Sequence, residues 1–241
     1  MSYAIAELRH AVRMIHAVAE NNVDRDHFYR VDRGYADEYF FGCKDWQQEV
    51  ADFASRLHTS NVPAVHLDVC GNTTADALGF DHSYQFSMSN RRLCRPHTTA
   101  CRGDIFNKLE FFAFLNEIEA ERGKLGFTSF MPMAGLQSYT PKSAVPGHRD
   151  ILYRMLFRQL AAVIDHTHIG GSVLLELPFQ LDAGDGRIAD HFSRTPFNQT
   201  KSHQTLKRWA KQLKCSVRGR KNLTGGSWLL RKDYKCLGPV P

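Results

Sequence analysis

The 241-residue chain lacks any long apolar run and any closely paired cysteines. No run approaches the roughly 20 apolar residues that a membrane-spanning helix needs. Charges are spread through the first twenty residues, so we expect neither a signal peptide nor a membrane helix there, and a cytoplasmic protein. None of the six cysteines forms a Cys-x-x-Cys pair, which favours free thiols over disulfides. Cys94, His97 and Cys101 have the residue types of metal ligands but no clear fourth partner, so no metal is predicted.

Acidic residues are scarce in the last quarter of the chain. Residues 181–241 contain 13 Lys or Arg and 4 Asp or Glu, a balance of +9, whereas residues 1–180 contain 18 and 21, a balance of −3. A basic region of this kind is compatible with RNA or another phosphate-bearing partner. A solvated basic surface produces the same pattern, and it is the more common cause.

Hydrophobic periodicity predicts an α/β protein in which strands alternate with helices. Helices are expected at 2–20, 45–57, 108–122, 150–164 and 206–213. Asp45 is the expected N-cap of the second helix, whose buried side carries Trp46, Val50, Phe53 and Leu57. In the helix 108–122 the buried face is expected to carry Leu109, Phe112, Leu115 and Ile118 or Glu119, with Phe111 and Phe114 widening it. Gly170-Gly171 is expected to turn the chain into the strand that begins at 172. Strands are expected at 65–69, 82–88, 127–133, 172–177, 215–220 and 227–231, with one more ending near 102–106. Residues 89–102 and 179–201 are expected to be loops. This order predicts a doubly wound, mostly parallel seven-stranded sheet with an antiparallel last strand. We divide the chain into an N-terminal helical cap, residues 1–60, and a Rossmann-like domain, residues 61–241.

The segment 63–79 has the pattern of a buried strand, a tight turn and the start of a helix. Asp68 lies near the end of the strand, and Cys70, Gly71 and Asn72 follow in the turn. A carboxylate at a strand end accepts hydrogen bonds from amines or hydroxyls, and glycine allows close approach of a ligand to the backbone. The segment has one glycine where a dinucleotide-binding turn has three, so nicotinamide chemistry is disfavoured. A nucleoside cofactor site and an ordinary strand-to-helix turn both fit the segment taken alone.

Several further segments match, in order and spacing, the class I S-adenosylmethionine-dependent methyltransferases. The matching stretches are Leu67-Asp68-Val69-Cys70-Gly71, Gly103-Asp104-Ile105-Phe106, Phe130-Met131-Pro132-Met133, His168-Ile169-Gly170-Gly171-Ser172 and Gly225-Gly226-Ser227-Trp228. The chain therefore resembles this family from about residue 60 to residue 235. The resemblance implies S-adenosyl-L-methionine as cofactor, held by Asp68, Cys70, Gly71, Asn72, Ser87, Asp104, Ile105 and Met131. In particular, it implies that Asp104 contacts the adenine amine.

The methyl acceptor is poorly defined because several acceptor-specific motifs are lacking. No Asn/Asp-Pro-Pro-Tyr/Phe motif follows the fourth strand, and no Lys-Asp-Lys-Glu tetrad is recognisable. A small molecule or sugar is therefore favoured, with RNA as an alternative. His148, His191 and Glu176 are the candidate general bases, in that order, because each follows or ends a strand near the expected site. A single glycine in the first motif, and Ser87 where the family has an acidic residue, leave a non-catalytic binding protein open as a third possibility.

Overall fold

The fold is described by a computed structural model for residues 44–70, 78–87, 97–132, 148–177, 180–181, 188–189, 199–221 and 226–233. Its helices are α3 (Lys44–Thr59), α4 (Lys108–Arg122), α6 (His148–Asp165) and α7 (Gln199–Gln212). Its strands are β1 (Val65–Val69), β2 (His82–Ser87), β3 (Thr98–Arg102), β4 (Leu125–Phe130), β5 (Thr167–Leu177), β6 (Gln180–Leu181), β7 (Ile188–Ala189), β8 (Cys215–Lys221) and β9 (Gly226–Lys232). The predicted helix at 2–20 lies outside the described residues, so the division at residue 60 stays a prediction.

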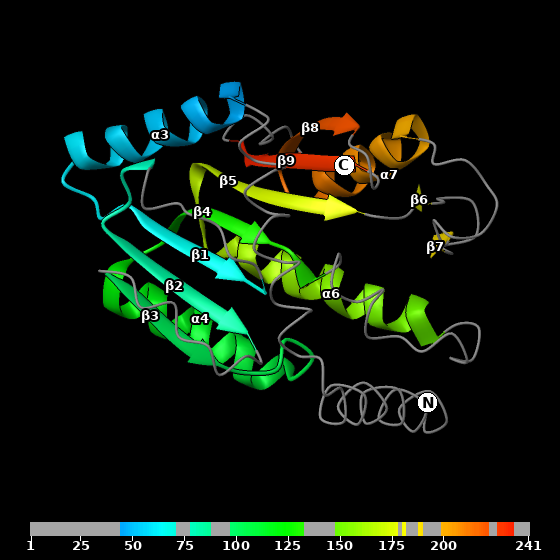
Figure 1. The fold of residues 1–241 in the computed structure, drawn as a ribbon, viewed down its shortest axis with the longest axis horizontal. Coiled ribbons are helices and arrows are strands. Elements are labelled where there is room, and N and C mark those ends of the chain that lie inside the picture. The colour runs from blue at the N-terminus through cyan, green and yellow to red at the C-terminus, as the bar shows by residue number, and fades with distance from the viewer. Residues whose placement is uncertain are drawn as a thin grey trace, which may run out of the picture.

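Seven strands form one sheet in the order β3-β2-β1-β4-β5-β9-β8 (Figure 1). The pairs from β3 to β5 are parallel, and β9 pairs antiparallel with both β5 and β8. The prediction of a mostly parallel seven-stranded sheet with an antiparallel last strand is confirmed. The strand β9 lies inside the sheet, and its antiparallel partner β8 forms the edge.

Helices cover both faces of the sheet, as doubly wound architecture requires. On one face, the apolar side chains of β1, β2, β4 and β5 pack with buried residues of α4, α6 and α7. On the other face, α3 covers β4 and β5 through Trp46 and Val50, which contact Phe127 and Leu174. Figure 1 shows α3 separated from α4 and α6 by the sheet. The carboxyl ends of the parallel strands therefore lie at one edge, between the two helical layers.

Helix α4 has the predicted bounds, but a different face is buried. Asn107 caps its N-terminus by accepting a hydrogen bond from the Glu110 N–H, and Gly123 ends it at φ 90°. The prediction placed Leu109, Phe112, Leu115 and Ile118 or Glu119 on the buried face, with Phe111 and Phe114 widening it. Leu109 is instead 81% exposed, and the buried face is formed by Phe111, Phe114, Leu115 and Ile118. The apolar residues crowded into the first two turns allow two overlapping stripes, and the buried one packs with Phe86 of the sheet.

Three expected loops or turns are strands. Residues 98–102 form the edge strand β3, whose one-sided pairing with β2 leaves polar side chains exposed and removes the apolar signature of a buried strand. Residues 180–181 and 188–189 form a small antiparallel pair within the predicted loop 179–201. The turn expected at Gly170-Gly171 is an irregularity inside β5, which starts at Thr167. Gly170 has φ 85° there, so the strand continues through a conformation that favours glycine.

The remaining boundary predictions also shifted. Strand β4 covers 125–130 rather than 127–133, and α6 begins at His148 rather than after Asp150. The predicted N-cap Asp45 lies inside the first turn of α3, which begins at Lys44. The Asp45 carboxylate accepts hydrogen bonds from the Arg220 guanidinium at 2.6 and 2.7 Å.

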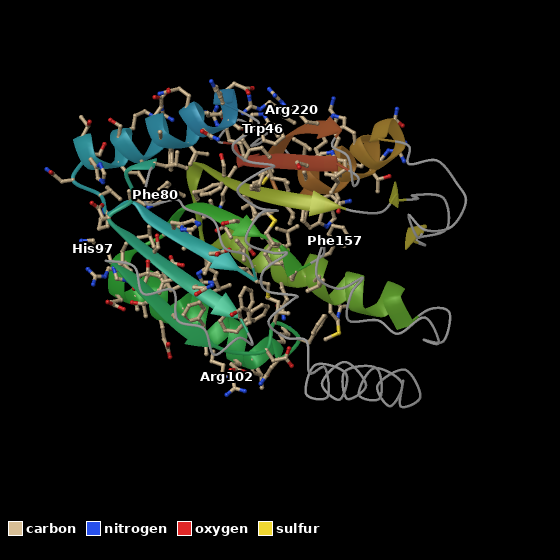
Figure 2. The ribbon with its side chains drawn as sticks, viewed as in Figure 1. Trp46, Phe80, His97, Arg102, Phe157 and Arg220 are labelled. Atoms are coloured by element: carbon tan, nitrogen blue, oxygen red, sulfur yellow. The ribbon has the colours of Figure 1, made fainter. Side chains whose placement is uncertain are left out.

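Ionic contacts join α3 to the β8–β9 hairpin. Besides the Arg220–Asp45 pair, Arg218 and Arg231 both approach Glu49. The Arg220 guanidinium also lies over the Trp46 ring, 5.3 Å from its centroid. The two residues are labelled next to each other in Figure 2. Part of the basic charge of the carboxyl-terminal region is therefore neutralised by acidic residues of α3.

Candidate functional site

Four strand ends meet at the carboxyl edge of the parallel sheet and are tied together by backbone hydrogen bonds. The Cys70 N–H donates to the Phe86 carbonyl at 2.9 Å, and the Gly103 N–H donates to the Ser87 carbonyl at 3.0 Å. On the other side of β1, the Met131 N–H donates to the Val69 carbonyl at 3.0 Å. Ligands of open α/β sheets bind at this kind of edge. The structure thus brings Cys70, Ser87, Asp104, Ile105 and Met131 to one edge of the sheet, and their role as cofactor ligands stays a prediction.

Cys70 adopts a left-handed backbone conformation, with φ 57°. This conformation costs a non-glycine residue roughly 1–2 kcal/mol. Strained residues persist where the surrounding structure requires them, often at ligand sites. The chain therefore turns at Cys70, the first residue of the predicted turn. Gly71 and Asn72 lie outside the described residues.

The loop after β3 is held closed by the Asp104 side chain. Asp104 Oδ1 accepts a hydrogen bond from the Phe106 N–H at 2.9 Å, and the Asp104 carbonyl accepts one from the Asn107 N–H at 2.9 Å. Gly103 precedes this turn, and a Cβ there would overlap the buried Phe86 ring. The side chain of Ile105 packs into the core, 5% exposed, so its backbone is the part that can reach a ligand. No described residue accepts a hydrogen bond from the Ile105 N–H.

A buried glutamine of α6 supports this loop from below. Gln159 is 2% exposed, and its Nε2 donates to the Ile105 carbonyl at 2.8 Å. The glutamine occupies a slot in the apolar stripe of α6, between Leu156 and Val163. A glutamine among the buried apolar positions of this helix could have indicated a buried polar contact in the sequence, but the sequence interpretation did not use it.

Polar side chains fill the opposite sheet face near Asp68. Asp68 is 3% exposed and lies between Gln85 of β2 and Ser129 of β4 in the strand register. One row below, His66 is hydrogen-bonded to Ser83 Oγ at 3.2 Å and to Ser129 Oγ at 3.0 Å. Central strands of a parallel sheet are normally apolar on both faces. The polar row therefore marks this face of β1 as the side on which Asp68 is presented.

The candidate general bases are not brought together by the described coordinates. His148 was expected in a loop, but it is the first residue of α6. Glu176 lies in β5, opposite Ser227 of β9, at the predicted strand end. The side chains of both, and the whole of His191, lie outside the described residues. Their assignment as general bases stays a prediction.

The possible metal ligands are likewise only partly described. His97 is exposed before β3, with φ 61°, and Cys94 lies outside the described residues. Burial, together with Glu110 and Glu117, raises the pKa of the Cys101 thiol, which opposes formation of a metal-binding thiolate. Within the described segments no group of three or more His, Cys, Asp or Glu side chains is placed to hold a metal ion.

Basic side chains remain exposed on α7. Lys207, Arg208 and Lys211 are exposed, and the sequence of α7 contains no Asp or Glu. No helix in the described part of the chain is both long enough and apolar enough to cross a membrane.

Comparisons with known proteins give structural likenesses and no sequence match. No protein-family model and no curated protein sequence matches the chain. Among solved structures, the chain is similar to the MycE methyltransferase from the mycinamycin biosynthetic pathway in complex with Mg and SAH (13% identity, TM-score 0.44), with 82% of this chain and 51% of that chain covered. It is also similar to an O-methyltransferase family protein from Burkholderia thailandensis (10% identity, TM-score 0.42), with 90% and 63% covered. A third is DhpI in complex with SAH (15% identity, TM-score 0.38), with 87% and 95% covered.

The chain thus spans about half the length of the MycE chain that it matches. The assignment of its fold rests on its own sheet, with five parallel strands, an antiparallel β9 and helices on both faces. This is the fold that the sequence resemblance implied, and the fold class is that of the class I methyltransferases.

Proposed function

We propose that the protein is an S-adenosyl-L-methionine-dependent methyltransferase. The observation that carries the proposal is the pairing of an acceptor and a donor on consecutive residues of the loop after β3. Asp104 presents a half-buried carboxylate, and Ile105 presents a backbone N–H without a partner among the described residues. The adenine edge offers the complementary pair, an amine that donates and a ring nitrogen that accepts.

The rest of the described edge fits the same cofactor. Ser87 ends β2 with a hydroxyl, which suits a ribose hydroxyl group. Cys70 turns the backbone sharply at the end of β1, and Asp68 stands beside that turn on the polar face. When bound, the cofactor supplies an electrophilic methyl group on a sulfonium. The protein's own part is to orient the two reactants and to exclude water from them.

For the acceptor, the proposal favours an oxygen or nitrogen of a small molecule or sugar. Met131 and Pro132 are buried where β4 ends, so no carboxylate follows directly from that strand. A general base would therefore come from His148, His191 or Glu176, each of which follows or lies in a later element. Activity at neutral pH suits an imidazole best, because its pKa lies near the working pH.

The test is calorimetric titration with S-adenosylhomocysteine, the demethylated form of the cofactor. We expect micromolar binding by the wild-type protein. Asp104→Ala should weaken it by about 10- to 100-fold, because one partner of a charge-assisted hydrogen bond is lost. Asp165→Ala, which removes an exposed carboxylate from the far end of α6, should leave the affinity unchanged. No binding by the wild-type protein at millimolar ligand would refute the proposal and favour a non-catalytic role.

A second candidate is a methyltransferase that acts on RNA, and the basic surface of α7 favours it. Lys207, Arg208 and Lys211 are exposed on a helix without carboxylates, so they add to the positive potential that attracts phosphates. Reversal of these three charges should lower RNA affinity at least about tenfold and flatten its salt dependence. Unchanged RNA binding by the triple variant would exclude this surface as the acceptor site.

A further inference from the structure

One peptide group in the loop after β3 is held by hydrogen bonds on both sides. Its carbonyl oxygen, on Ile105, accepts from Gln159 Nε2 at 2.8 Å. Its N–H, on Phe106, donates to Asp104 Oδ1 at 2.9 Å. The two bonds form a continuous chain from the side chain of α6, through the peptide, to the carboxylate of Asp104.

Such a chain fixes the orientation of the carboxylate. The Gln159 amide defines the plane of the Ile105–Phe106 peptide, and that plane defines where the Phe106 N–H points. The orientation of the Asp104 carboxylate is set in turn by this N–H, because Asp104 Oδ1 accepts its hydrogen bond. Hydrogen bonds in series polarise one another, which strengthens each of them in a buried setting.

The buried position of Gln159 lowers the stability of the folded protein. It is 2% exposed in the apolar core, and its Oε1 has no hydrogen-bond partner in the described part of the chain. A buried acceptor without a partner costs about 1–3 kcal/mol. Helix α6 thus carries an imperfectly satisfied polar group at a position from which it reaches the loop carbonyl.

We propose that Gln159 is a positioning residue that, through the Ile105–Phe106 peptide, sets the preference of this site for a 6-amino purine. The proposal rests on the proposed function, in which Asp104 accepts the adenine amine. A purine with a 6-oxo group presents a carbonyl to the carboxylate and a ring N–H to the Ile105 N–H. Both contacts are then repulsive, but only while Asp104 and Ile105 are held in place.

A purely structural role for Gln159 makes a different prediction. In that case the glutamine only satisfies a buried carbonyl, and its loss lowers stability without changing which base is preferred. Selectivity between two ligands separates the possibilities, because a general loss of stability affects both ligands alike.

The experiment compares S-adenosylhomocysteine with S-inosylhomocysteine by titration calorimetry. The variants are Gln159→Met, which keeps the length but removes the amide, and Gln159→Asn, which keeps the amide but is one methylene too short to reach Ile105. The matched control is Thr167→Val. Thr167 is also buried and donates to an α6 carbonyl, that of Val163 at 2.7 Å, but at the opposite end of the sheet.

We expect the wild-type protein and Thr167→Val to prefer the adenosyl ligand by at least about tenfold, and both Gln159 variants to lose about tenfold of that ratio. A wild-type ratio in either folded Gln159 variant would overturn the inference and leave cofactor binding intact. Equal affinity of the wild-type protein for the two ligands would also overturn the inference, because Asp104 would then not distinguish the 6-amino group from a 6-oxo group. No wild-type binding of either ligand would refute the proposed function itself, and the inference with it.

Discussion

Replacement of Cys70 by glycine should stabilise the protein relative to replacement by alanine. Both substitutions remove the same sulfur atom, so they differ only in the Cβ atom and in the backbone conformations that its presence or absence favours. At φ 57°, alanine keeps a penalty of about 1–2 kcal/mol that glycine does not have. Glycine loses about 0.5–1 kcal/mol more conformational entropy on folding. The balance is about 0.5–1 kcal/mol in favour of Cys70→Gly.

The measurement is equilibrium unfolding in urea, with the midpoints compared at a common slope. Cys215 provides the control, because it is a buried free cysteine in β8 and is not among the described non-glycine residues with positive φ. There the order should reverse, with Cys215→Gly less stable than Cys215→Ala by about 0.5–1 kcal/mol. If Cys70→Gly is no more stable than Cys70→Ala, Cys70 does not adopt the left-handed conformation at the end of β1, and the turn in the candidate site is misplaced.

Three further predictions concern other parts of the fold. Gly103→Ala should lower the free energy of unfolding by about 1–3 kcal/mol, since its Cβ overlaps the buried Phe86 ring, and an unchanged urea midpoint would contradict the tight turn. Lys232→Met should lower the free energy of unfolding by about 1–3 kcal/mol, because the ammonium donates hydrogen bonds to three carbonyls at the α6–β5 junction. The control Lys211→Met, on an exposed face of α7, should lower it by less than about 0.5 kcal/mol. Equal losses in the two variants would contradict a stabilising role for the Lys232 hydrogen bonds. Burial, with Lys124 and Lys232, lowers the pKa of His168 below 6.5, so the unfolded chain takes up the proton first and stability falls as pH decreases from about 7. His168→Gln should show a shallower loss of stability between pH 7 and 5, and parallel wild-type and variant curves would show that His168 does not contribute.

The buried elements of the fold were predictable from the sequence because their patterns are local. β1 and α4 have the expected bounds, and the core stripe of α3 at Trp46, Val50 and Phe53 is buried as predicted. The edge strand β3 was expected a few residues too late in the chain, because it pairs on one side only, with β2, and one-sided pairing leaves no apolar repeat in the sequence to mark its bounds. The bend in β5 was taken as a turn because two glycines in sequence do not distinguish a turn from an irregular strand.

For the candidate site, only the placement of residues at the carboxyl ends of the strands was predictable from the sequence. Asp68, Cys70, Ser87, Asp104 and Met131 do come to one edge, because parallel strands place their carboxyl ends together. The support for the Asp104 loop was not predictable, since Gln159 is more than fifty residues away and acts through tertiary contact. The turn that begins at Cys70 was predicted, but its left-handed backbone conformation was not, since cysteine carries no propensity signal for positive φ.

The central place of β9 has a consequence for synthesis of the chain. β9 is the last described strand to be made, yet it pairs with β5 on one side and β8 on the other. At about 5–20 residues per second, the ribosome needs several seconds to move from Leu177 to Lys232. During that interval the outer edge of β5, with the apolar Val173 and Leu175, has no strand beside it, and open apolar edges template aggregation. The nascent protein should therefore depend on chaperones most during this interval, and ribosome pausing between β5 and β9 should lower its yield.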